Sequence, residues 1–89
     1  MDLKKAFGGA LRNLRVSKGL TQEDFSIVSS RTFLSTLERG MKGVSLEKVD
    51  GLAATMGIHP VTLIVACYLQ KDESQDLEEL FSRVRAELP

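Results

Sequence analysis

The 89-residue sequence has one cysteine, one histidine, two prolines and no tryptophan. Cys67 has no partner for an internal disulfide, and His59 belongs to no spaced set of metal ligands. We therefore expect no metal and no cofactor, with Cys67 in the core or in an interface and His59 capping a helix. An enzyme is not expected either, because no nucleophile accompanies a matched base and no glycine-rich phosphate loop follows a strand.

Long apolar runs are also missing. No stretch of about 18 apolar residues occurs, so no transmembrane helix is predicted, and the first residues lead into no apolar signal segment. We expect no membrane partner and a reduced, cytoplasmic location. The length leaves no room for a sensor domain, so no small-molecule effector is expected.

The net charge is zero, but the charges are unevenly distributed. Residues 1–43 carry eight Lys and Arg against four Asp and Glu, whereas residues 44–89 carry four against eight. Such asymmetry indicates that the first half faces a polyanion and that the second half has another role.

Every periodic segment has helical spacing, and no stretch alternates apolar and polar residues as a half-buried strand would. The pattern predicts an all-α fold. Residues 1–70 are expected to form one domain, and residues 71–89 a linker and a C-terminal helix. The expected helices span about residues 3–17, 22–28, 31–39, 46–56, 60–70 and 75–88.

The segments 22–28 and 31–39 have the layout of a helix-turn-helix DNA reader, in which the second helix enters the major groove. On that second helix, Leu34 and Leu37 are expected to face inward. The opposite face carries short polar and guanidinium groups that can hydrogen-bond base edges. These residues are Arg31, Thr32, Ser35 and Thr36. An ordinary solvated helix face is the alternative interpretation.

Three motifs follow one another along the chain: LRNLR at 11–15, KGLTQEDF at 18–25 and LERG at 37–40. Together they resemble the Cro/repressor-type, XRE-like helix-turn-helix family, and residues 56–60 are similar to that family's entry into its fifth helix. The resemblance covers about residues 7–69. It implies a five-helix, phage-repressor-like DNA-binding domain, here followed by an additional C-terminal helix.

The resemblance also implies roles for single residues. Arg31, Thr32 and Thr36 match positions that touch bases. Arg15 and Glu38 match a structural ion pair between the first and third helices, and a simple surface pair is the alternative. Contacts with the DNA backbone are implied for Thr21, Gln22, Arg39 and Lys42. For Thr21 and Gln22, helix capping alone is the alternative.

One departure from the family pattern concerns spacing. Thr21 and Glu38 are 17 positions apart, which is shorter than usual in the family, and Val28-Ser29-Ser30 contains no turn glycine. Either the first helix of the motif is shortened or the turn is tighter. The assignment of base contacts can therefore shift by one residue.

The segment 60–70 is apolar nearly all round, and a five-helix domain can bury only one side of it. The last helix adds a second apolar stripe, and monomers rarely leave several hundred Å² of contiguous apolar surface in water. We therefore expect a homodimer in which these surfaces meet. The expected interface residues are Val61, Val65, Tyr68, Leu69, Leu77, Leu80, Phe81 and Val84. In the alternative, the last helix folds back within one chain.

These observations predict a sequence-specific regulator of transcription that binds double-stranded DNA. We expect a repressor that binds an inverted-repeat operator as a homodimer. Similar proteins of bacteria and their phages also serve as antitoxins or as controllers of restriction–modification genes, and these roles are the alternatives. A helical protein-interaction domain without DNA is the alternative from another class. Retention on heparin and release by salt would distinguish a DNA binder from it.

Overall fold

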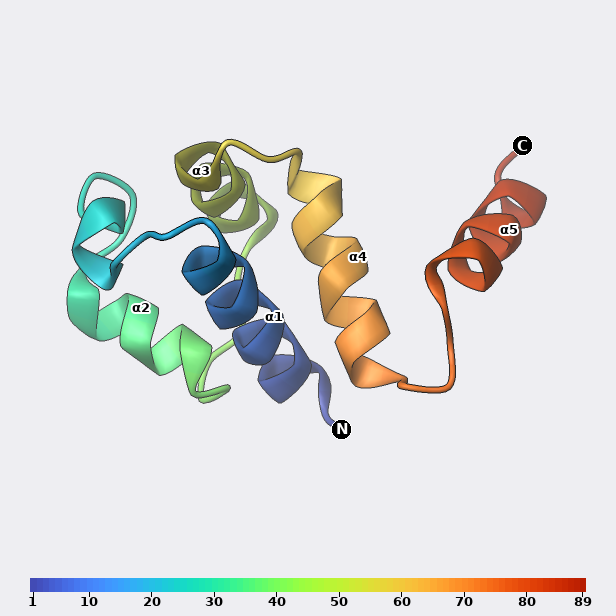
Figure 1. Ribbon diagram of the computed structural model, residues 1–89, viewed down its shortest axis with the longest axis horizontal. Coiled ribbons are helices and arrows are strands. Elements are labelled where there is room, and N and C mark those ends of the chain that lie inside the picture. Colours follow the sequence, from blue (N-terminus) through green and yellow to red (C-terminus); the bar gives the residue numbers. More distant parts are fainter.

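The computed structural model describes residues 1–89, and all of its regular structure is helical (Figure 1). The predicted all-α fold, with five helical segments followed by an additional C-terminal helix, is confirmed. The elements are α1 (Leu3–Ser17), the 3₁₀ helix η1 (Gln22–Phe25), α2 (Arg31–Glu38), α3 (Leu46–Met56), α4 (Pro60–Lys71) and α5 (Leu77–Glu87).

The first helix of the motif is much shorter than predicted. In place of an α-helix over 22–28, a single 3₁₀ helix of four residues ends at Phe25, whose side chain is fully buried. The backbone N–H groups of Val28 and Ser29 both donate to the Phe25 carbonyl, at 2.9 Å each, so one further turn follows η1 without continuing as a regular helix. Two serines flank β-branched Ile27 and Val28 in this segment, and these residue types favour turns and extended chain over helix.

Each α-helix begins after a residue whose side chain accepts a hydrogen bond from a backbone N–H of the first turn. The capping role expected of His59 is confirmed, because its Nδ1 accepts from Val61 N at 3.0 Å. Helix α2 ends at Glu38, one residue earlier than expected, and Arg39 forms its C-cap. The five capping residues are Asp2, Ser30, Ser45, His59 and Asp76.

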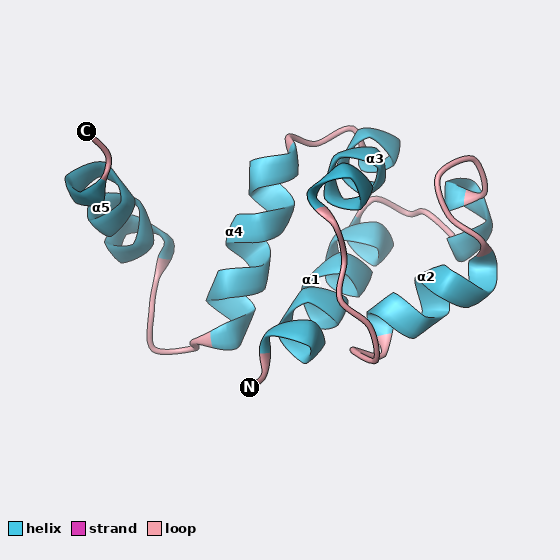
Figure 2. Cartoon of the chain, turned by 180° about the vertical axis from the view of Figure 1, so that it is seen from behind, coloured by secondary structure: helices cyan, strands magenta, loops and turns pink.

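Helix α1 lies between α2 and α4, and the core forms where these helices meet η1 and α3 (Figures 1 and 2). Cys67 lies in this core at 3% exposure, as expected. Burial of these side chains provides most of the stabilisation of so small a domain. The core consists of Ala6, Phe7, Ala10, Leu11, Phe25, Leu34, Leu37, Val49, Leu52, Met56, Leu63 and Cys67.

Two glycines allow α1 to approach α2 closely. A Cβ atom on Gly8 would lie 2.4 Å from the backbone oxygen of Leu37. Gly40, which follows α2, has a φ of +73°, and a Cβ atom there would lie 2.7 Å from Cα of Lys5. Any larger residue at either position would therefore push α2 away from α1.

Helix α5 stands at the far end of the molecule, on the side of α4 that faces away from α1 (Figure 2). It contains no buried residue. The chain reaches it through a turn in which the Asp72 carboxylate accepts hydrogen bonds from the N–H and hydroxyl of Ser74.

No single helix has both the length and the hydropathy needed to cross a membrane. Helices α3 and α4 meet those criteria only when counted together, across a bend of 104°.

Candidate nucleic-acid interface

The orientation of α2 is set by its buried side. Leu34 and Leu37 are both fully buried, so the residues on the other side of the helix point away from the core. Arg31 and Thr32 are exposed, and Ser35 and Thr36 are half-buried. The structure thus brings the four residues predicted to contact bases onto the outer side of one helix.

Arg31 lies at the exposed start of this outer side. Its Nη1 is 3.5 Å from Oε1 of Glu23 in η1, and both side chains are about two-thirds exposed, at 71% and 68%. An exposed pair of this kind contributes about 1 kcal/mol or less. The guanidinium can therefore leave Glu23 for a stronger acceptor, such as the O6 and N7 atoms of guanine.

Thr36 has a different chemical character. Its hydroxyl donates to the carbonyl of Thr32 at 2.8 Å, which leaves its methyl group and an oxygen lone pair available to a partner. A threonine methyl is suited to contact with the methyl group of thymine.

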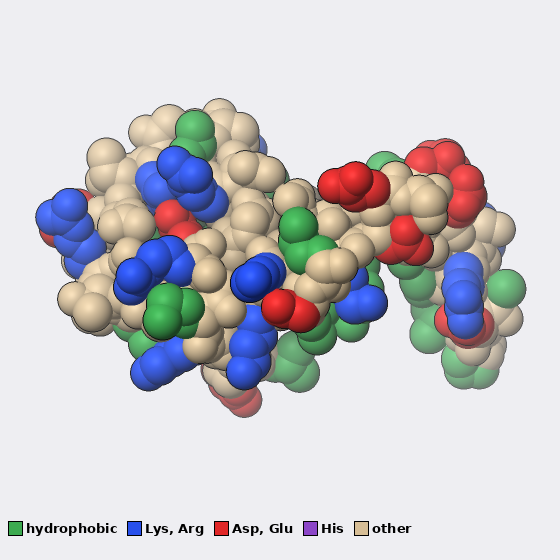
Figure 3. Space-filling model, turned by 90° about the horizontal axis from the view of Figure 1, so that it is seen from below, with side chains coloured by type: hydrophobic (Ala, Val, Ile, Leu, Met, Phe, Trp, Pro, Cys, Tyr) green, Lys and Arg blue, Asp and Glu red, His purple; other side chains and the backbone are tan.

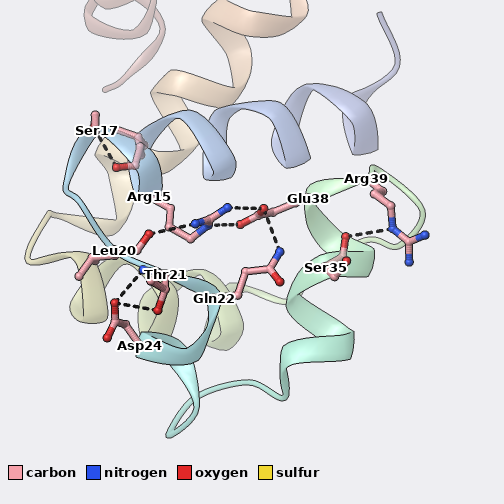
Figure 4. Close-up of polar contacts among 10 residues, drawn as sticks. Arg15, Ser17, Leu20, Thr21, Gln22, Asp24, Ser35, Glu38 and Arg39 are labelled. Carbon is pink, nitrogen blue, oxygen red and sulfur yellow. Dashed lines mark hydrogen bonds and ion pairs between the residues drawn. The ribbon is translucent and has the colours of Figure 1, made fainter.

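Behind α2, a buried charge network joins three elements (Figure 4). Arg15 of α1 donates from Nε to Oε2 of Glu38 at 2.6 Å and from Nη2 to Oε1 at 3.0 Å. The side chains are only 12% and 5% exposed. Gln22 of η1 also donates to Glu38, at 3.3 Å, and Arg15 donates to the Leu20 carbonyl at 2.9 Å. The network therefore ties α1 and η1 to the end of α2.

Arg15 and Glu38 were expected to form either a structural ion pair or a simple surface pair. The hydrogen bonds to Glu38 raise the pKa of Arg15, against the burial that acts to lower it. The paired geometry and the low exposure distinguish this bidentate contact from a loose surface pair.

The four residues predicted to touch the DNA backbone differ in the hydrogen-bond donors that they have available for a phosphate. Thr21 donates to the Asp24 carboxylate through both its N–H, at 2.7 Å, and its hydroxyl, at 3.1 Å, and so has no spare donor. The Gln22 amide keeps one of its two N–H donors free of Glu38. Arg39 and Lys42 are exposed. Nε of Arg39 lies 3.4 Å from the Ser35 carbonyl, and the ammonium group of Lys42 lies 5.5 Å from the centre of the Phe33 ring.

The uneven charge along the sequence becomes a spatial separation. Seen from the side on which α2 lies, Lys and Arg side chains spread over the body of the domain, while Asp and Glu side chains gather at the α5 end (Figure 3). Phosphates are attracted to the first region and repelled by the second.

Sequence reasoning missed two contacts at this surface. One is the Arg31–Glu23 pair between α2 and η1. The other is Lys48 of α3, whose ammonium group reaches the Val28 carbonyl and the Phe33 ring. No spacing rule signals either contact, because both depend on how separate elements pack.

No group of three or more His, Cys, Asp or Glu side chains is placed to hold a metal ion. Every buried side-chain nitrogen and oxygen atom has a hydrogen-bond partner.

An all-α domain in which η1 and α2 are joined by a short turn, with a polar outer side on α2, is a helix-turn-helix DNA-binding protein. The sequence profile of the helix-turn-helix family matches residues 11–63. The chain belongs to the XRE-type helix-turn-helix family of DNA-binding transcriptional regulators.

Known proteins support this assignment. The chain is 38% identical over 66 residues to the HTH-type transcriptional regulator y4dJ of Sinorhizobium fredii, covering 72% of this chain and 86% of that protein. The structure of the restriction-modification controller protein C.AhdI from Aeromonas hydrophila matches with a TM-score of 0.62 and 38% identity, over 66% of this chain and 92% of that one. The clp gene regulator ClgR from Corynebacterium glutamicum matches with a TM-score of 0.74 and 29% identity, over 94% of this chain and 90% of that one.

Proposed function

We propose that this protein binds an inverted-repeat operator in double-stranded DNA as a homodimer and represses transcription there. The observation that carries the proposal is the outer side of α2, where Arg31, Thr32, Ser35 and Thr36 form a polar surface without a carboxylate of its own. A repressor of this kind acts by occupying a promoter, which requires only specific binding.

Contacts with phosphates would hold α2 in the groove. Arg39 and Lys42, just beyond the C-terminus of α2, are the exposed cations best suited to this role. Gln22 contributes its remaining amide donor at the start of η1. Thr21 can donate to a phosphate only if its hydrogen bonds to Asp24 break, so we expect it to contribute least to DNA binding.

The homodimer is proposed from the apolar surfaces of α4 and α5, with residues 1–70 as the DNA-binding domain and 71–89 as the dimerisation element. Clefts of about 590 and 320 Å³ lie between these helices and are lined mainly by apolar side chains. Val61, Tyr68, Leu77, Phe81 and Val84 are each 41–51% exposed. A second copy would remove this surface from water, at about 25 cal/mol per Å² of apolar area.

Truncation tests the dimer. We expect the full chain to sediment as a dimer at tens of micromolar, and a chain ending at Gln70 to sediment as a monomer. The matched control is Glu78→Gln, an exposed change on the polar side of α5 that should leave the dimer intact. A full-length monomer at that concentration, unchanged by truncation, would rule this interface out.

Selection of bound sites from random double-stranded DNA tests the operator. We expect an inverted repeat with half-site centres about 34 Å apart, one helical turn, because a two-fold dimer presents two copies of α2. Placed over a reporter promoter, that site should lower expression when the protein is produced. Selection of single half-sites, or of no common sequence, would contradict the proposal.

A second candidate function is control of restriction–modification genes. The 38% identity to C.AhdI, a restriction-modification controller protein, favours it. The reporter separates the two roles, because a controller that switches genes on would raise expression from some placement of the same operator.

A further inference from the structure

Lys48 lies on the first turn of α3, outside the two segments of the helix-turn-helix motif. Its Nζ donates to the carbonyl of Val28 at 2.6 Å, in a part-buried position. Val28 belongs to the turn that joins η1 to α2, twenty residues earlier in the chain. No carboxylate forms an ion pair with Lys48.

Lys48 supplies the hydrogen bond to the Val28 carbonyl, which accepts none from the backbone. The turn has no glycine, and none of its residues has a positive φ. Helix α3 also packs against the turn, because a Cβ atom built on Gly51 would lie 3.4 Å from Cγ1 of Val28. Helix α3 therefore lies against the turn that follows the four-residue η1.

The same ammonium group also contacts α2. Nζ of Lys48 lies 5.1 Å from the centre of the Phe33 ring, within the range of a cation–π interaction. Lys42 approaches the same ring at 5.5 Å but forms no hydrogen bond with the turn. Lys48 therefore contacts the chain on both sides of Ser30, the residue that caps α2.

We propose that Lys48 is a positioning residue that sets the angle at which α2 enters the major groove. It does so by holding the Val28 carbonyl and the Phe33 ring from α3, and it does not bind phosphate itself. The inference rests on the proposed function, in which α2 reads the bases. A recognition surface loses affinity when its supporting shell lets it move by less than an ångström.

The experiment measures the affinity of full-length variants for the selected operator duplex over a series of salt concentrations. Lys48→Met removes the donor and the charge but keeps the length of the side chain. We expect it to bind about tenfold more weakly, from the loss of one hydrogen bond to a charged group. The slope of log affinity against log salt should stay unchanged, because no phosphate contact is lost. Lys48→Arg, which can both donate and stack on an aromatic ring, should restore the affinity.

Lys42→Met is the matched control, since it removes the other ammonium group over Phe33. As a proposed phosphate contact, it should lower the salt slope by about 0.9. If Lys42→Met and Arg31→Ala both bind normally, the proposed function itself fails.

If those two variants behave as expected, three results at position 48 would overturn the inference about Lys48. The first is unchanged affinity of Lys48→Met, and the second is a salt slope lowered by about one, which would make Lys48 a phosphate contact. The third is failure of Lys48→Arg to restore binding. A Lys48→Met chain that does not fold would also count against it, because the residue would then maintain the whole domain.

Discussion

Replacing Arg15 by alanine is expected to lower the free energy of unfolding by about 3–5 kcal/mol, because it leaves the Glu38 carboxylate buried without its partner. Glu38 is 5% exposed and would retain only the Gln22 amide, at 3.3 Å. The Leu20 carbonyl would lose its donor as well. Small domains are stable by only about 5–15 kcal/mol, so the change should be visible in a thermal or urea unfolding curve.

Arg12→Ala is the matched control, since Arg12 is an exposed arginine of the same helix without an ion-pair partner. It should change the unfolding free energy by no more than about 0.5 kcal/mol. The double variant Arg15→Met with Glu38→Leu should be more stable than Arg15→Ala, because no charge is left buried. Equal melting temperatures for Arg15→Ala and Arg12→Ala would show that the pair does not support the fold.

Arg31→Ala and Thr36→Ala are each expected to weaken binding to the selected operator by about 1–3 kcal/mol, and to change which sequence is preferred. For Arg31 the physical reason is the loss of a bidentate pair of hydrogen bonds to a guanine. For Thr36 it is the loss of the methyl group, because the hydroxyl donates to the Thr32 carbonyl. Competition binding against every single-base change in the half-site measures both effects.

Arg39→Ala provides the comparison, because Arg39 lies beyond the base-reading side of α2. It should weaken all sequences about equally and lower the salt slope by about one. If Arg31→Ala keeps both the affinity and the preference of the natural sequence, α2 does not read bases through that residue. The motif has a shortened first helix, so Thr32 or Ser35 would then be the next positions to test.

Much of the scaffold could be predicted from local signals. The helical spacing of apolar residues placed α1 at 3–17, and the starts expected near residues 31, 46 and 60 agree with those of α2, α3 and α4. Helical spacing depends on neighbours within one or two helical turns, which is why a single sequence shows it. The pair between Arg15 and Glu38 was implied only by the resemblance to the XRE-like family, and the structure has these side chains 2.6 Å apart.

The length of η1 was not predictable in the same way. The motif KGLTQEDF favours a helix that continues to Val28, and the shorter spacing to Glu38 left two solutions open. Burial of Phe25 in the core decided between them. That burial is a tertiary effect, and a propensity of a few tenths of a kcal/mol per residue does not override it.

The sequence by itself determined the helical class, the family and the four residues on the outer side of α2, because each depends on residue type and spacing along one element. Only the tertiary structure decided the rest. It brought Lys48 to the Val28 carbonyl, paired Arg31 with Glu23, and left α5 without a buried residue. The physical reason is that a side chain's hydrogen bonds depend on which elements lie within about 3 Å of it. That distance is set by packing between segments far apart in the sequence.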